Sequence, residues 1–236
     1  MKRFLGPGLL AVVLAGGVGY WFLSPASLIA DVERFAPYRN RLESGESLKI
    51  VAIGDSITAG TNSPRPYSAI LEEQLNARFP RARVRVVNAG VPGDTAEGGL
   101  RRVDRDVLSQ SPDLVLIEFG WNDLKNGVSA EDFETSMRSL VGQIRSDSEA
   151  MIYLLTTTHV NVVLSSWKIS SRNKIIRAIA KDLDCGLIDL DRAFGYETGS
   201  GVDLKDLLSN DNLHPSDLGQ SLIARTVLQN WLGGRN

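Results

Sequence analysis

The chain has 236 residues, of which 43% are hydrophobic and 23% charged, and its formal net charge is −2. This length and composition predict one globular domain with a large core and exclude a disordered chain. The slightly acidic balance and the absence of a basic cluster give no electrostatic case for binding nucleic acid. The single cysteine, Cys185, excludes an intrachain disulfide and a multi-cysteine zinc site, and we expect it to be a core thiol.

The N-terminal segment carries a membrane or export signal. Met1-Lys2-Arg3 precedes twenty uncharged residues, FLGPGLLAVVLAGGVGYWFL, at positions 4–23. That is about the length of a membrane-spanning helix, and the preceding basic residues predict a cytoplasmic N-terminus. We therefore predict a signal-anchor over residues 1–30, with the remainder on the extracytoplasmic side of the membrane. The alternative is a cleaved signal peptide, because small residues flank the proline in Ser24-Pro25-Ala26.

Strand-like and helix-like segments alternate from residue 48 onward, after a polar, partly helical spacer over residues 31–47. Apolar runs predict strands over 48–53, 113–120, 151–158 and 185–190, and alternating residues predict a strand over 82–88. The helical spacing of apolar residues predicts helices over 65–79, 96–109, 129–147, 170–184 and 216–232. This alternation predicts a five-stranded parallel sheet inside a three-layer α/β/α sandwich, which forms one domain over 48–236.

Unusual residues follow several of the predicted strands. They are Ser56 in GDSIT, Gly93 in NAGVPGDT, Asn122 in GWND, and Asp211 with His214 in DNLHP. Each could be a turn or cap residue when taken alone. Because ligands bind at the carboxyl ends of parallel strands, we expect these residues to share one edge of the sheet. Together they would supply the nucleophile, the base, its orienting acid and the oxyanion donors of a serine hydrolase.

These four blocks resemble the SGNH (GDSL) hydrolase superfamily, over about residues 48–232. The likeness is greatest to the branch of bacterial thioesterase, lysophospholipase and arylesterase enzymes. The resemblance implies a flavodoxin-like fold with Ser56 as nucleophile, His214 as base and Asp211 as the acid that orients it. It also implies an oxyanion hole made by the backbone N–H groups of Ser56 and Gly93 and by the Asn122 side chain. In this family the aspartate that precedes the serine, here Asp55, supports the turn.

His159, the only other histidine, is a rival base at the end of the fourth predicted strand. It has no acid nearby at the required spacing, so we expect it to line the substrate pocket instead. The loop over 159–170 contains several apolar residues that could line an acyl groove or pack onto the domain, namely Val160, Val162, Val163, Leu164 and Trp167.

The sequence therefore predicts a carboxylic ester hydrolase that needs no cofactor and no metal. Its expected substrate is a small-molecule acyl ester of a lipid, an aryl alcohol or a sugar, and its expected partner is the membrane that holds the N-terminal helix. Two alternatives stay open. One is an acyltransferase or deacetylase acting on cell-envelope sugars or lipids with the same triad, and the other is a non-catalytic ligand-binding module.

Overall fold

The structure is a computed structural model and describes residues 25–161 and 166–233. The predicted membrane segment over residues 4–23 lies outside these residues, so the anchor stays a prediction. None of the helices in the described part of the chain combines the length and the apolar character that a membrane crossing requires.

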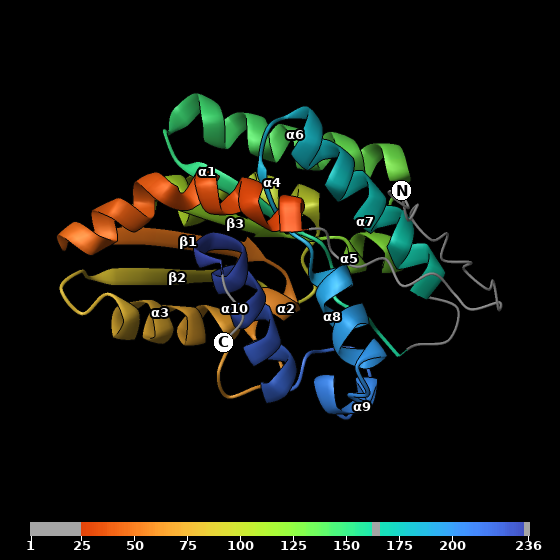
Figure 1. Cartoon of the computed structure of the whole chain (residues 1–236). Coiled ribbons are helices and arrows are strands. Elements are labelled where there is room, and N and C mark those ends of the chain that lie inside the picture. The colour runs from red at the N-terminus through yellow and green to blue at the C-terminus, as the bar shows by residue number, and fades with distance from the viewer. Residues whose placement is uncertain (1–24, 162–165, 234–236) are drawn as a thin grey trace, which may run out of the picture.

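A parallel sheet of five strands forms the centre of the fold, as predicted (Figure 1). The strands lie in the order β2-β1-β3-β4-β5, and every neighbouring pair is parallel. Gly54, the last residue of β1, is in register with Gly90 of β2 and with Glu118 of β3. The carboxyl ends of these three strands therefore lie side by side. The bounds are β1 Leu48–Gly54, β2 Val84–Gly90, β3 Leu114–Glu118, β4 Met151–Leu155 and β5 Gly186–Ile188.

Helices cover both faces of the sheet and complete the three layers (Figure 1). One apolar core lies between the sheet and α1, α3 and α10, and a second lies between the sheet and α4, α6 and α7. Because both faces are covered, β1 and β3 are buried almost throughout, which explains their continuous apolar sequences. The bounds are α1 Pro25–Ser44, α3 Tyr67–Arg78, α4 Ala96–Asp106, α6 Ala130–Asp147, α7 Ser166–Asp182 and α10 Asp217–Leu232.

Helix α1 is longer and more tightly packed than the partly helical spacer that we expected. Phe35 is completely buried and stacks on Trp231 of α10 with ring centroids 4.6 Å apart. Arg34 forms an ion pair of 2.6 Å with Asp184, which precedes β5. The chain from residue 31 to Ser44 is therefore part of the folded unit and not a free linker.

The sequence also missed four short helices. Helices α2 (Ser56–Ala59) and α5 (Trp121–Lys125) follow the ends of β1 and β3 directly. Helices α8 (Leu190–Gly199) and α9 (Leu204–Leu207) occupy the region after β5 that we expected to be a long loop. The side chains of Asp189 and Asp203 cap these two helices by accepting hydrogen bonds from backbone N–H groups of their first turns.

Candidate active site

Ser56 lies at the point where β1 passes into helix α2. Asp55 caps this helix, because its Oδ1 accepts a hydrogen bond of 2.9 Å from the backbone N–H of Ile57. Ser56 is the first residue of the helix. The Asp55 side chain accepts from Ile57 and not from the backbone N–H of Ser56. The turn therefore places both the hydroxyl and the N–H of Ser56 at the carboxyl edge of the sheet.

The structure brings His214 and Asp211 to the same edge. Nε2 of His214 lies 2.9 Å from Oγ of Ser56, although the two residues are 158 positions apart. Nδ1 of the same ring lies 2.5 Å from Oδ2 of Asp211. The imidazole thus bridges the serine hydroxyl and the carboxylate, which is the order of contacts that the sequence predicted.

Asp211 is held by several donors besides the imidazole. Its carboxylate accepts hydrogen bonds from Ser209 Oγ, from Asn62 Nδ2, and from the backbone N–H groups of Leu213 and His214, at 2.7 to 3.0 Å. Partial burial alone would raise the pKa of Asp211, but the hydrogen bonds, first among them that of the His214 ring, hold this pKa well below its usual range. Asp211 is therefore a carboxylate at neutral pH.

Gly93 lies in a tight turn after β2. The backbone N–H of Asp94 donates to the carbonyl of Val91 at 3.1 Å, and Pro92 and Gly93 form the centre of the turn. Gly93 has a φ of +82°, as the third residue of a type II turn requires, which explains the glycine. A side chain at this position would meet no atom within 4 Å, so the turn borders open space.

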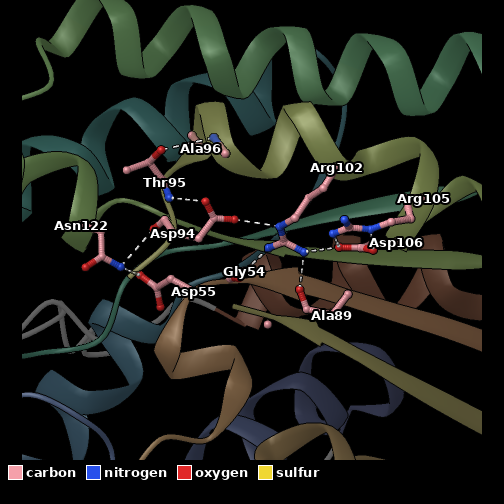
Figure 2. Close-up of polar contacts among 12 residues, drawn as sticks. Gly54, Asp55, Ala89, Asp94, Thr95, Ala96, Arg102, Arg105, Asp106 and Asn122 are labelled. Atoms are coloured by element: carbon pink, nitrogen blue, oxygen red, sulfur yellow. Dashed lines mark hydrogen bonds and ion pairs between the residues drawn. The ribbon is translucent and has the colours of Figure 1, made fainter. Parts of the chain in front are cut away.

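Asn122 is the second residue of helix α5 and is almost fully buried. Figure 2 shows its side-chain amide pointing toward two acceptors, Oδ2 of Asp55 and the carbonyl of Asp94, each 3.0 Å from Nδ2. These contacts occupy both hydrogens of the amide. The amide therefore connects the Ser56 turn to the Gly93 turn, and an oxyanion would compete with one of these acceptors.

Arg102 is a buried residue of this region that the sequence analysis missed. Its guanidinium donates to the carbonyls of Gly54 and Ala89 at 2.9 and 2.7 Å, and it pairs with Asp94 and Asp106 (Figure 2). It thereby joins the ends of β1 and β2 to the loop that contains Gly93. Its position in an amphipathic helix gave no sign of this role, because arginine usually lies on a solvated helix face.

A pair of buried carboxyl groups lies beneath the serine, and the sequence analysis missed its second member. Asp55 and Glu118 are both completely buried, and their side chains are within hydrogen-bonding reach of each other. Burial raises the pKa of both groups, and the proximity of Asp55 raises that of Glu118 further. Glu118 ends β3 inside an apolar run, which is an unusual place for an ionisable residue.

His159 does not contact Ser56. Its Nε2 lies 3.1 Å from Oδ1 of Asp191, the second residue of α8. The expectation that His159 has no acid nearby was wrong, because the acid comes from a helix that the sequence did not reveal. Arg177 also binds Asp191. Burial alone would raise the pKa of Asp191, but the hydrogen bonds from His159 and Arg177 lower it to about 2.

A small apolar cluster borders the candidate site. Trp121 and Leu213, which directly precede Asn122 and His214, pack together with Val160. Ile169 and Leu124 complete this cluster, and Val160 is buried in it. Val162, Val163 and Leu164 lie outside the described residues, as does the side chain of Trp167, so most of the proposed acyl groove stays a prediction. Within the described part of the chain, no group of three or more metal-ligating side chains comes together.

A sequence model of the GDSL-like lipase/acylhydrolase family matches residues 52–222, a stretch that includes all the motifs described above. The chain belongs to this family. Among its GDSL-like relatives, an acetylxylan esterase of Geobacillus stearothermophilus is 28% identical over 217 residues, which cover 80% of this chain and 95% of the relative. Esterase TesA of Pseudomonas aeruginosa is 26% identical over 180 residues, 75% of this chain and 85% of that one.

Solved structures of esterases have the same architecture. The crystal structure of the Geobacillus stearothermophilus acetylxylan esterase superposes with a TM-score of 0.71 at 26% identity and covers 82% of this chain and 97% of that one. A two-domain esterase active on acetylated mannans superposes with a TM-score of 0.73 at 26% identity. That match covers 86% of this chain but 54% of the two-domain enzyme, so the chain spans about half its length. The predicted family is confirmed, and the protein is a serine ester hydrolase.

Proposed function

We propose that the protein hydrolyses carboxylic esters through an acyl-enzyme on Ser56, with His214 as general base and Asp211 as the acid that orients it. The observation that carries this proposal is the chain of contacts from Ser56 Oγ to His214 Nε2 at 2.9 Å and from His214 Nδ1 to Asp211 at 2.5 Å. Both distances lie at or near the hydrogen-bonding range that proton transfer requires.

The proposed order of proton transfers follows from these contacts. Ser56 Oγ attacks the ester carbonyl and gives its proton to His214 Nε2, and the Asp211 carboxylate stabilises the imidazolium that forms. When the tetrahedral intermediate collapses, the bond to the leaving alcohol breaks and His214 returns the proton to that oxygen. Water then attacks the acyl-enzyme with the same base, and Ser56 is released with the carboxylic acid product.

The same proposal assigns the oxyanion hole to the N–H groups of Ser56 and Gly93 and to the Asn122 amide. Two observations support it: Ser56 is the first residue of a helix, and the Gly93 turn borders open space. The Asn122 amide donates to Asp55 and Asp94 in the described structure, so it would exchange the Asp94 carbonyl for the substrate oxygen. Each such donor contributes about 10²–10³-fold to turnover.

We further propose an acetylated saccharide as the substrate class. The Geobacillus stearothermophilus acetylxylan esterase, 95% of which is covered by the alignment, acts by its name on an acetylated polysaccharide. The two-domain esterase is likewise described as active on acetylated mannans. A longer acyl chain is the competing choice, because thioesterase 1/protease 1/lysophospholipase L1 of Escherichia coli is 30% identical over 97 residues, 41% of this chain and 45% of that one. Transfer of the acyl group to a sugar alcohol would use the same acyl-enzyme.

The test is ester hydrolysis by the full chain and by Ser56→Ala, with Ser146→Ala on the exposed surface of α6 as a matched control. The substrates are p-nitrophenyl acetate, butyrate and octanoate, and acetylated xylo- and manno-oligosaccharides. We expect Ser56-dependent release that is greatest for the acetyl esters. Equal activity of Ser56→Ala and the wild type would overturn the esterase mechanism, and a preference for octanoate would overturn the substrate class.

The proposed location is the extracytoplasmic face of a membrane, with residues 1–30 as an uncleaved anchor. The export signal in the sequence supports this proposal. N-terminal sequencing of the mature protein from membranes is the test. Retention of Met1–Lys2 on a protein that resists salt extraction is expected, and recovery of a soluble form that begins near Ser27 would contradict the anchor.

A further inference from the structure

Asp55 and Glu118 receive different numbers of hydrogen-bond donors, so the negative charge is stabilised unequally on the two groups. Asp55 accepts one N–H on each oxygen, from Ile57 at 2.9 Å and from Asn122 at 3.0 Å. Glu118 has only a long contact, 3.5 Å from Oε2 to the hydroxyl of Thr58, and its Oε1 is buried with no partner among the donors of the described residues.

Two carboxylates cannot both be ionised at hydrogen-bonding distance in a buried site, because neither is hydrated and each repels the other. The N–H donors stabilise the charge on Asp55. A proton on Glu118 would give its unpartnered carboxyl group a donor, and the Asp55 carboxylate is the acceptor within reach. The buried Arg102 guanidinium, among the described residues, pairs with Asp94 and Asp106 instead of with this pair.

We propose that Glu118 is a positioning residue that is neutral in the working enzyme and donates a hydrogen bond to the Asp55 carboxylate. Asp55 in turn caps the Ser56 helix through Ile57 and holds the Asn122 amide. Glu118 therefore fixes, through one side chain, the geometry of both the nucleophile and the side-chain oxyanion donor. This inference depends on the proposed function only for its kinetic consequences.

The arrangement has a consequence at alkaline pH. Loss of the shared proton would leave two adjacent carboxylates, whose repulsion would displace Asp55 from Asn122 and Ile57. The ionisable groups that face the pair are Asp123 of α5 and His214, which lies in the loop before α10. Tyr67 of α3 is connected to the pair through the Thr58 hydroxyl. Asp123 is a further acid and opposes ionisation of the pair, whereas a protonated His214 favours it. We therefore expect an alkaline limb of kcat that belongs to the Asp55–Glu118 pair.

Two variants of the full chain test the proposal. Glu118→Gln keeps a side-chain N–H donor that never loses its proton, whereas Glu118→Leu keeps the approximate volume and has no donor. We expect Glu118→Gln to retain most of the wild-type kcat and to lack the alkaline limb. We expect Glu118→Leu to lose on the order of 10²-fold in kcat with little change in KM, because the nucleophile and the Asn122 amide are no longer held in register.

Infrared difference spectroscopy tests the protonation state without any substrate. Near neutral pH, the carbonyl band of a protonated carboxyl group should be present in the wild type and absent in Glu118→Gln. The matched control is Glu131→Gln, on the exposed start of α6, which should keep the band. Equal spectra of Glu118→Gln and the wild type would overturn the proposal, as would equal impairment of Glu118→Gln and Glu118→Leu. If Glu118→Leu does not fold, the kinetics and the infrared spectrum of Glu118→Gln still test whether Glu118 is the protonated donor. Failure of Ser56→Ala to abolish hydrolysis would overturn the esterase mechanism and leave the infrared result intact.

Discussion

Nε2 of His159 is in contact with Asp191, 3.1 Å away, and the same carboxylate also binds Arg177. Both histidines of the chain therefore have a carboxylate partner, but among the described residues only the ring of His214 also reaches a serine hydroxyl. A histidine–acid pair alone does not identify a catalytic base. The third contact, from the imidazole to the nucleophile, separates the two.

The two histidines are expected to differ sharply in their effect on turnover. His214→Ala should lower kcat for p-nitrophenyl acetate by about 10⁴-fold or more, because Ser56 then has no base. His159→Ala should leave kcat close to the wild-type value, since its ring is bound to Asp191. Steady-state kinetics of both variants, with melting temperatures to verify folding, make the comparison. A larger loss of kcat in His159→Ala than in His214→Ala would show that the base is assigned wrongly.

Gly93→Ala separates the conformational role of this glycine from its role in the site. Gly127 is a matched control, because it also has a positive φ, +72°, and a side chain there would also meet no atom within 4 Å. Both substitutions should cost about 1–3 kcal/mol in free energy of unfolding, since alanine is strained in this region. Gly93→Ala alone should also lower kcat. Equal kcat values in the two variants would mean that the conformation of the Gly93 turn does not affect turnover.

The buried pair predicts a pH-dependent stability difference. The pKa of Glu118 is raised in the folded protein, so the unfolded chain loses this proton first as the pH rises above about 4. Ionisation therefore favours unfolding of the wild type, and Glu118→Gln is free of this penalty. The free energy of unfolding of Glu118→Gln minus that of the wild type should increase as the pH rises from about 4 into the neutral range, measured by urea denaturation. A difference that is constant over this range would be inconsistent with a raised pKa.

Helix α1 should be required for the stability of the catalytic domain. Phe35→Ala removes a fully buried ring that stacks on Trp231 and should cost about 3–5 kcal/mol in free energy of unfolding. Tyr196→Ala is the control, because that side chain is 60% exposed and should change stability by no more than about 0.5 kcal/mol. Similar costs in the two variants would mean that α1 packs on the domain less tightly than the structure indicates.

Most of the sheet could be predicted from the sequence because β1, β3 and β4 are buried almost throughout and appear as continuous apolar runs. Helices α8 and α9 could not, since they are short and their caps, Asp189 and Asp203, look like ordinary loop residues. The packing of α1 was missed for another reason. The surface that Phe35 covers is created by Trp231, almost two hundred positions later, so no local pattern encodes it.

The site residues that carry the family motifs could be predicted, whereas the contacts of those that support them could not. Ser56, Asn122 and His214 occur in short motifs with turn residues around them. Arg102 occurs in a helix whose sequence gives no sign of its burial, and Glu118 occurs in an apolar strand whose sequence does not show what the carboxyl group contacts. Their roles depend on the side-by-side ends of β1, β2 and β3, which exist only in the folded chain.

The central claim is that Ser56 is the nucleophile and that His214 activates it. Mass spectrometry of peptides from the full chain, after reaction with a fluorophosphonate ester, measures this most directly. We expect one phosphonylated residue, Ser56, with labelling abolished in Ser56→Ala and slowed by orders of magnitude in His214→Ala. Labelling of another residue, or labelling of Ser56 at an undiminished rate in His214→Ala, would contradict it.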